Sequence, residues 1–405
     1  MIVWYQEKLG RRFETAAKAM VVLSAFSIPL GTAWMSISTA LLFLFWLLSG
    51  HFRQKFNTIT SNGVALWALG LYLLLAIGLT YTSADWDSAM HVFSKYKKIL
   101  FIPIIISLMI SEKWRRYAIL VFIASMLIVL VMSYLKYLQI LPYGPPGQEY
   151  TVFKGRIAHG IFMSFFFYLM VHASILYPRW RWIFSIIALL AMINLLFLNT
   201  GRSGYVVFAA LVVLLFFQYF NWRGVLISFV ALFMLVVLGY FVSDHFRNRI
   251  NESVSDVKAY VPGEYNHFSG LRYRLEFYQT TIKVIKKSPW FGHGTGSLET
   301  EYKKIADKEG LVVTNNPHNE FMMMMAQLGV IGLFAFSGML YYQWRSSYQL
   351  DLESRYIMQG VVVTMASGCM LNSLLLDAGE GRFYVVLTAI IFSIPMFKTG
   401  VMEKN

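Results

Sequence analysis

Long apolar runs are the feature of this sequence that most constrains its fold. A helix that crosses a bilayer needs about 20 mostly apolar residues, and about twelve such runs follow one another along the chain. They cover roughly residues 16–32, 33–50, 63–82, 99–111, 117–139, 158–177, 182–198, 205–220, 225–243, 320–343, 356–376 and 383–397. Backbone groups in lipid must be hydrogen-bonded within the protein. The runs therefore predict an all-α polytopic membrane protein with about twelve transmembrane helices.

The composition supports a membrane protein and excludes other classes. Hydrophobic residues make up 57% of the chain and charged residues only 14%, whereas a soluble domain carries about 25% charged residues. The net charge of +14 therefore suits cytoplasmic loops and anionic lipid or phosphate partners, and no nucleic acid is expected. The single cysteine, Cys369, excludes an internal disulfide and a cysteine-based metal site.

The Lys and Arg residues of the loops predict the orientation. With the N-terminus in the cytoplasm, sixteen of them fall on the cytoplasmic side and eight in the short outer segments. Positive charge concentrates on the cytoplasmic side, so both termini are predicted to lie there. Residues 1–243 then hold transmembrane helices 1–9, residues 244–319 form a long outer loop, and residues 320–405 hold helices 10–12. The first two runs are separated only near Gly31 and Thr32, so two helices and one broken helix both stay open.

The long outer loop carries two amphipathic patterns. The first runs from Arg272 to Lys287, with apolar residues at Leu271, Leu275, Tyr278, Ile282 and Ile285. This alternation of steps of three and four predicts a helix with one apolar face, which Ser288-Pro289 ends. Gly292, Gly294 and Gly296 then predict a turn, and Leu298, Tyr302 and Ile305 predict a second short helix. Such helices are expected to lie on the membrane surface or to roof a cavity.

Two outer motifs carry arginine. The first is Thr200-Gly201-Arg202-Ser203-Gly204, at the end of the seventh run, and the second is Arg272-Tyr273-Arg274-Leu275-Glu276, at the start of the first loop helix. A helical hairpin with a snorkelling arginine explains the first motif, and an exposed basic helix end explains the second. The guanidinium is also a planar, permanently charged fork that suits phosphate. Both motifs are therefore candidates for a phosphate site.

His318 and Asn319 follow Pro317 just before the tenth run. Proline disfavours helix in the residue before it, so the pair is expected at a helix N-terminus near the membrane edge, where capping alone explains both residues. Histidine also titrates near neutral pH and can accept a proton from a hydroxyl. His318 is therefore the candidate general base, and His293 is the next candidate.

Further charged residues lie on the same predicted face. They are Lys95, Lys97 and Lys98 before the fourth run, Lys154, Arg156 and His159 before the sixth, and Asp377, Glu380 and Arg382 in the last outer loop. Snorkelling explains each cluster alone, but together they place an unusual number of ionisable groups on one face. No two histidines have the spacing of a helical zinc site, and no nucleotide-binding motif is present. Neither a metal nor another cofactor is expected.

Three motifs together resemble the O-antigen ligase and polymerase superfamily. They are Thr200–Gly204, the stretch from Arg274 through Ser288-Pro289-Trp290-Phe291-Gly292-His293-Gly294, and His318-Asn319-Glu320-Phe321 followed by Gly329-Val330-Ile331-Gly332. The second motif often carries Trp where this chain has Tyr278. The resemblance implies a GT-C-like helical fold and an inner-membrane protein whose active site faces the periplasm. It also implies inversion at the anomeric carbon without a metal, with His318, Arg274 and Arg202 as catalytic residues.

The resemblance leaves several activities open. Ligases move O-antigen from undecaprenyl pyrophosphate to the lipid A core oligosaccharide, polymerases join repeat units, and a third branch glycosylates proteins. The compact, basic chain without an extra C-terminal domain most resembles a ligase. A lipid-linked sugar transporter or flippase is the alternative from another class. We expect six further residues to bind substrate or phosphate: Arg272, Arg156, Lys154, Lys95, Arg382 and Asn319.

Overall fold

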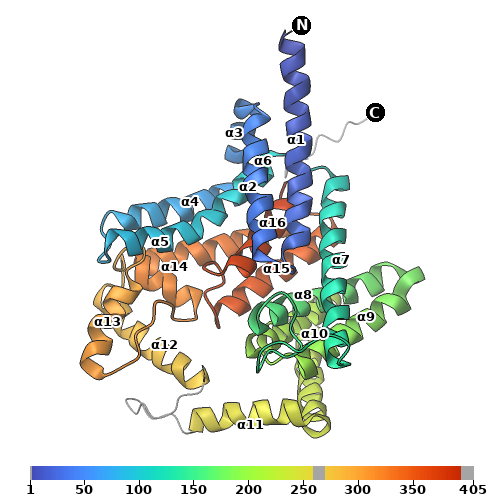
Figure 1. The fold of residues 1–405 in the computed structure, drawn as a ribbon, viewed down its shortest axis with the longest axis vertical. Coiled ribbons are helices and arrows are strands. Elements are labelled where there is room, and N and C mark those ends of the chain that lie inside the picture. Colours follow the sequence, from blue (N-terminus) through green and yellow to red (C-terminus); the bar gives the residue numbers. More distant parts are fainter. Residues whose placement is uncertain (1, 259–269, 394–405) are drawn as a thin grey trace.

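The computed structural model of the chain describes residues 2–258 and 270–393, and every regular element within them is a helix (Figure 1). Five helical segments are long and apolar enough to cross a membrane. They are α7 (Glu112–Tyr137), α8 (Arg156–Leu176), the segment Pro178–Leu198, α10 (Arg202–Val242) and α14 (Glu320–Ser347). The bent pair α2 (Thr32–Leu48) and α3 (Phe52–Thr60) adds a sixth if it counts as one span. The all-helical membrane character is confirmed, whereas the count of twelve and the GT-C-like assignment stay predictions.

The first two runs form two separate helices. α1 (Ile2–Ser27) and α2 are joined by a short turn and pack side by side. A buried hydrogen bond of 2.9 Å between the hydroxyls of Ser24 and Ser38 links them. The broken-helix alternative is thereby excluded.

The apolar run 99–111 does not form one long helix. Its first residues belong to the 3-10 turn η1 (Lys97–Leu100), and the next seven form the short helix α6 (Phe101–Ser107). The helices α4 (Gly63–Leu79) and α5 (Trp86–Tyr96) precede the run. Lys98 in η1 explains part of the break, because its buried ammonium donates to backbone carbonyls of the distant segment 375–377. A tertiary contact thus overrides the apolar pattern.

The predicted runs 205–220 and 225–243 are the two halves of α10. They are divided by a kink at Asn221, which has φ 53° and ψ −145°. The second half exposes large apolar side chains, such as Leu226 (71% exposed), Phe233 (69%) and Phe241 (75%). A surface of this kind is expected to face lipid.

The end of the chain places three more helices around the site. α14 is broken at Gly329 (φ 66°, ψ −157°), α15 spans Leu352–Cys369 and α16 spans Ala378–Ile391. The predicted run 356–376 is therefore too long at its end, because residues 370–377 leave the helix and form a loop. Residues 394–397 of the last predicted run lie outside the described residues.

The segment after α10 contains both helices that the amphipathic patterns predict. They are α12 (Gly270–Lys287) and α13 (Leu298–Glu309), and α11 (Asp244–Lys258) precedes them without having been predicted. The predicted apolar face of α12 is partly wrong, since Ile282 is 44% exposed. The buried residues of α12 are instead Glu276, Phe277, Thr280, Thr281, Val284 and Ile285. The ring of Phe277 packs against Tyr302 of α13 and His318, so contacts with these elements set the buried face.

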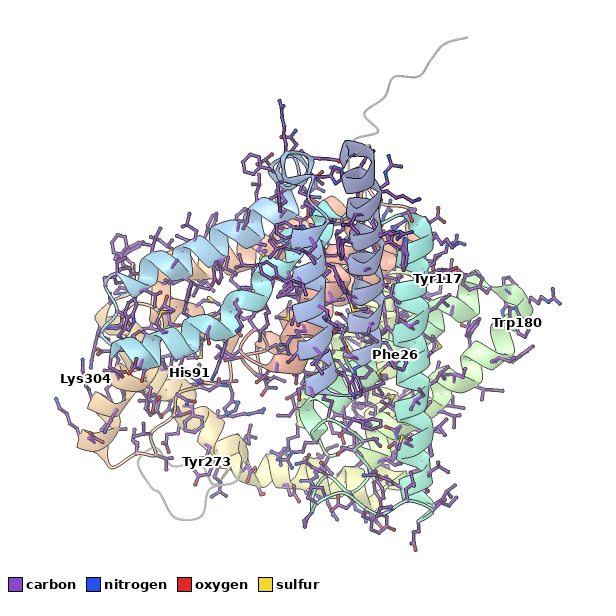
Figure 2. The ribbon with its side chains drawn as sticks, turned by 45° about the horizontal axis from the view of Figure 1, so that its top comes forward. Phe26, His91, Tyr117, Trp180, Tyr273 and Lys304 are labelled. Atoms are coloured by element: carbon purple, nitrogen blue, oxygen red, sulfur yellow. The ribbon has the colours of Figure 1, made fainter. Side chains whose placement is uncertain are left out.

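The segments that charge assigns to opposite membrane sides also separate in space. On one face the start of α7 meets α15, where Arg115 donates to the Ser354 hydroxyl at 3.1 Å. A cavity at this contact is lined by Arg116 of α7, Glu353 of α15 and Trp180. Figure 2 shows Trp180 far from Tyr273 of α12. Figure 1 likewise places α3 and the start of α1 at one end of the molecule and α11 at the other.

Candidate active site

Four arginines from separate segments line one small cavity. It has a volume of about 220 Å³ and lies between the start of α8, the motif that opens α10, α11 and α12. The arginines are Arg156, Arg202, Arg249 and Arg274. We call this the arginine cavity. It brings together Arg202 and Arg274, which are 72 positions apart in the sequence, together with Arg156.

The glycines of the first motif allow Arg202 to reach the cavity. Gly201 caps α10, and a Cβ atom there would lie 2.4 Å from the carbonyl oxygen of Arg156. Gly204 touches Gly160, so α8 and α10 approach closely. The Arg202 guanidinium forms loose ion pairs with Glu252 at 3.4 Å and Asp256 at 3.5 Å. These contacts hold the guanidinium at the cavity. They leave its hydrogen-bonding capacity partly unused, because strong charge-assisted hydrogen bonds are about 2.8 Å long.

Arg274 is more buried and is held by an amide instead of a carboxylate. Its Nη2 atom donates to Oδ1 of Asn372 at 3.2 Å. Burial lowers the pKa of Arg274, with Tyr278 opposing this effect and Arg202 and Arg156 adding to it. Arginine stays charged in spite of such shifts. Four arginines thus meet two carboxylates, Glu252 and Asp256, so the cavity keeps an excess of positive charge.

His318 lies between helices α12 and α14 in a conformation that few residues other than glycine adopt. Its φ is 52°, and its N–H donates to Oδ1 of Asn316 at 2.8 Å. The imidazole stacks on Phe277, with ring centroids 6.1 Å apart. Burial lowers the pKa of His318 and Arg274 lowers it further, while a hydrogen bond with Asn372 raises it. The ring is therefore neutral at pH 7 and able to accept a proton.

The loop of residues 370–377 joins these groups, and the sequence analysis missed it. Asn372 is buried, accepts from Arg274, and donates to the Ser203 hydroxyl at 2.9 Å. Ser373 donates to the same Asn316 oxygen that holds His318, at 2.8 Å. The adjacent polar residues Asn372 and Ser373 were a usable signal, because such a pair is unusual within an apolar span.

The rest of the second motif has a structural role. Its turn packs against the break in α14, where His293 and Gly294 donate their N–H groups to the carbonyls of Ala326 and Gln327 at 3.0 and 2.8 Å. These carbonyls would otherwise have no partner at the helix break. Gly294 has φ 92°, and a Cβ atom there would lie 2.2 Å from the Cα of Thr82. The His293 ring bonds to the Val284 carbonyl at 3.0 Å, so His293 holds the turn in place.

Two predicted substrate-binding residues have partners outside the arginine cavity. Arg272 lies 3.8 Å from Asp256. Asn319 caps α14 by accepting from the N–H of Met322 at 3.0 Å, and its amide donates to the Met370 carbonyl at 3.1 Å. Both ends of the Asn319 side chain are thus used, as the capping interpretation predicts.

Three other predicted residues lie around the loop 370–377 and the start of α16. Lys95 and Arg382 line a second cavity of about 620 Å³. Lys154 has a buried ammonium close to Gly379. Within residues 2–258 and 270–393, no group of three or more His, Cys, Asp or Glu side chains could hold a metal ion.

The fold and this geometry define a helical membrane protein with a cavity lined by four arginines. Residues 187–337 match the family model described as O-antigen ligase. This match confirms the predicted resemblance to the O-antigen ligase and polymerase superfamily over that stretch. The matched stretch contains Arg202, Arg274 and His318, whereas Asn372 lies beyond it. Members of that family are membrane glycosyltransferase-like enzymes.

One relative supports a second comparison. The chain is 24% identical over 162 residues to a Haemophilus influenzae protein that is described as uncharacterized. The aligned part covers 38% of this chain and 40% of that protein. The similarity thus reaches less than half of either chain, and it adds no activity to the family match.

Proposed function

We propose that this protein is an O-antigen ligase. It transfers O-antigen polysaccharide from undecaprenyl pyrophosphate to a sugar hydroxyl of the lipid A core oligosaccharide, with inversion and without a metal. The observation that carries the proposal is the arginine cavity, which lies beside a neutral, half-buried histidine. A pyrophosphate leaving group needs cations, and a hydroxyl nucleophile needs a proton acceptor.

The arginines act on the donor. As the bond between the anomeric carbon and the phosphate oxygen breaks, negative charge accumulates on the departing pyrophosphate. Arg274 and Arg202 stabilise that charge through bidentate contacts, and Arg156 adds a third cation from the rim of the cavity. The loose pairs of Arg202 with Glu252 and Asp256 exchange for shorter contacts with phosphate.

His318 acts on the acceptor. The sugar hydroxyl attacks the anomeric carbon from the face opposite the pyrophosphate, which inverts the configuration in one step. The hydroxyl proton passes to the His318 imidazole, which burial and Arg274 keep neutral beforehand. Phe277 and Asn316 hold the residue in place during this transfer.

The location in the inner membrane with a periplasmic active site belongs to the same proposal. The positive-inside count predicts it, and the separation of the two sets of loop segments in space supports it. The apolar helices are suited to hold the polyprenyl tail of the donor and the acyl chains of the acceptor.

The transporter alternative is less well supported. A transporter is expected to carry ionisable groups near the middle of the membrane, at the interface of inverted repeats. The cationic residues predicted on the outer side instead gather where the loop segments meet, around the arginine cavity and the loop 370–377.

A reconstitution tests the proposal. Purified protein in liposomes receives lipid-linked O-antigen and lipid A core, and the products are separated on a gel. The expected result is a ladder in which the acceptor carries O-antigen. Polymerised donor without acceptor modification would indicate a polymerase, and movement of donor across the bilayer without transfer would indicate a flippase. Either result contradicts the ligase proposal.

A further inference from the structure

A second cavity beside the loop 370–377 combines apolar walls with cations. It measures about 620 Å³, which is within the usual size range of ligand sites. Its apolar lining includes Ala40, Phe43, Leu100, Phe101 and Ile104, and its cations are Lys95, Lys97, Lys98 and Arg382. We call it the lysine cavity. A ligand with an apolar chain and an anionic head fits this combination.

Three of the four cations are available to a ligand. Lys98 is already used, because its ammonium donates to the carbonyls of Leu375 and Asp377, each at 2.7 Å. Arg382 makes only a long contact of 3.3 Å with the Ser36 hydroxyl. In the part of the chain that the structure describes, neither Lys95, Lys97 nor Arg382 forms a salt bridge. The lysine cavity thus holds three cations that no salt bridge among the described residues engages, with the Asp377 carboxyl within electrostatic reach of Lys95 and Lys98.

The lysine cavity lies beside the membrane surface of the protein. α2 supplies one wall, and the neighbouring side chains Trp34 and Ile37 on the same helix are 64% and 51% exposed. Exposed apolar residues on a membrane helix face lipid. A lipid can therefore enter from the bilayer with its head at the lysines, and a soluble phosphate compound would leave the apolar wall uncovered.

A third cavity extends from this region to Asn316, which is hydrogen-bonded to His318. It measures about 300 Å³, and it shares Lys95 and Leu376 with the lysine cavity. At its other side it reaches Asn316, whose side chain holds the His318 N–H. His91, labelled in Figure 2, also lines it. A lipid head at Lys95 can thus extend its sugars toward His318.

We infer that the lysine cavity binds the phosphorylated head of the glycolipid acceptor, so that donor and acceptor reach His318 from opposite sides. This inference rests on the proposed ligase function. Phosphate is suited to lysine, a point charge on a flexible stem, where its orientation need not be fixed. The fixed forks of Arg202 and Arg274 remain for the reacting pyrophosphate.

Binding to the double variant Lys95→Ala/Lys97→Ala tests the inference. Protein in phosphatidylcholine nanodiscs receives fluorescent lipid A core that is either phosphorylated or treated with phosphatase. Wild type is expected to bind the phosphorylated lipid at least about tenfold more tightly than the treated lipid, and the double variant should lose this preference. Lys95→Arg/Lys97→Arg should keep it, because the charges remain. Lys303→Ala, an exposed lysine on α13, is the matched control and should behave as wild type.

Kinetics extend the test to the reaction. The double alanine variant should raise the KM for acceptor about tenfold while the KM for donor stays unchanged. Equal binding of both lipids by wild type would overturn the inference, as would an unchanged preference in the double variant. Competition by inorganic phosphate at equal potency would also overturn it, in favour of a free-phosphate site. If wild type binds as expected but transfers nothing, the ligase function fails. If wild type transfers O-antigen but the lysine substitutions change neither binding nor KM, the assignment of the acceptor site to the lysine cavity is wrong.

Discussion

The arginine cavity and the lysine cavity recognise anionic groups in opposite ways. In the first, planar cations are held by partners, Arg202 by two carboxylates and Arg274 by Asn372. In the second, Lys95 and Lys97 are flexible and form no salt bridge among the described residues, and the walls are apolar. A reacting group requires fixed geometry, whereas capturing a lipid head requires only charge and an apolar surface. The arginine cavity is therefore suited to the reacting group and the lysine cavity to binding a lipid head, and each prediction below tests this division of roles.

Loss of the proton acceptor should have the largest effect. His318→Ala is expected to lower the rate of transfer by about 10²–10⁴, while binding of the lipid-linked donor by the arginines persists. Transfer assays and donor-binding assays on the same preparation measure this. His293→Ala is a comparison, expected to act through the stability of the turn against α14. A full rate in His318→Ala would place the base elsewhere.

A conservative substitution of Arg274 should cause the second-largest loss of transfer rate. Arg274→Lys keeps the charge but loses the planar fork, so the rate should fall by about 10²–10³, or roughly 3–4 kcal/mol of transition-state stabilisation. The reverse exchange in the other cavity, Lys95→Arg, should leave the transfer rate within about twofold. Near-normal turnover of well-expressed Arg274→Lys protein would remove the contrast between the two cavities.

Asn372 should matter less than Arg274, because it positions groups without touching the donor. Asn372→Ala removes the hydrogen bonds to Arg274 and Ser203, which should cost roughly 1–2 kcal/mol and lower the rate about tenfold. Asn57→Ala, an exposed change on α3, is the control. If both variants keep the wild-type rate, Asn372 has no role in positioning.

The pH dependence should be shallow near neutrality. A general base works when neutral, so activity is lost as pH falls through its pKa. Burial and Arg274 hold the pKa of His318 below its ordinary value of about 6.5. The value of kcat/KM should therefore stay flat from pH 8 to about 6.5 and fall only at lower pH. A decline that begins above pH 7 would contradict a depressed pKa.

Chelation should have the smallest effect. Since the cations of both cavities are side chains, full activity in EDTA is expected, measured as transfer after dialysis against the chelator. Loss of activity that a divalent ion restores would contradict this assignment and make His318 a candidate metal ligand.

The motif residues were predictable from the sequence because their chemistry is local. Arg202 and Arg274 stand in recognisable patterns, and the amphipathic repeats predict α12 and α13. Asn372 was hidden because an apolar run shows that a segment prefers lipid but not where a helix ends. Two other differences from the sequence prediction are the break at Lys98 and the buried face of α12. Both depend on partners that are distant in sequence.

The break at Gly329 divides α14 into a short and a long helical half. The short half, residues 320–328, begins two residues after His318 and is held to the turn 289–294 through the carbonyls of Ala326 and Gln327. The long half, residues 330–347, packs against α4, where Trp67 contacts the rings of Phe334 and Tyr342. The N–H of Val330, the first residue of the long half, donates to the Pro289 carbonyl at 2.8 Å, so the same turn holds both halves. The turn therefore sets the angle at which the two halves of α14 meet, and it holds in place the half that follows His318.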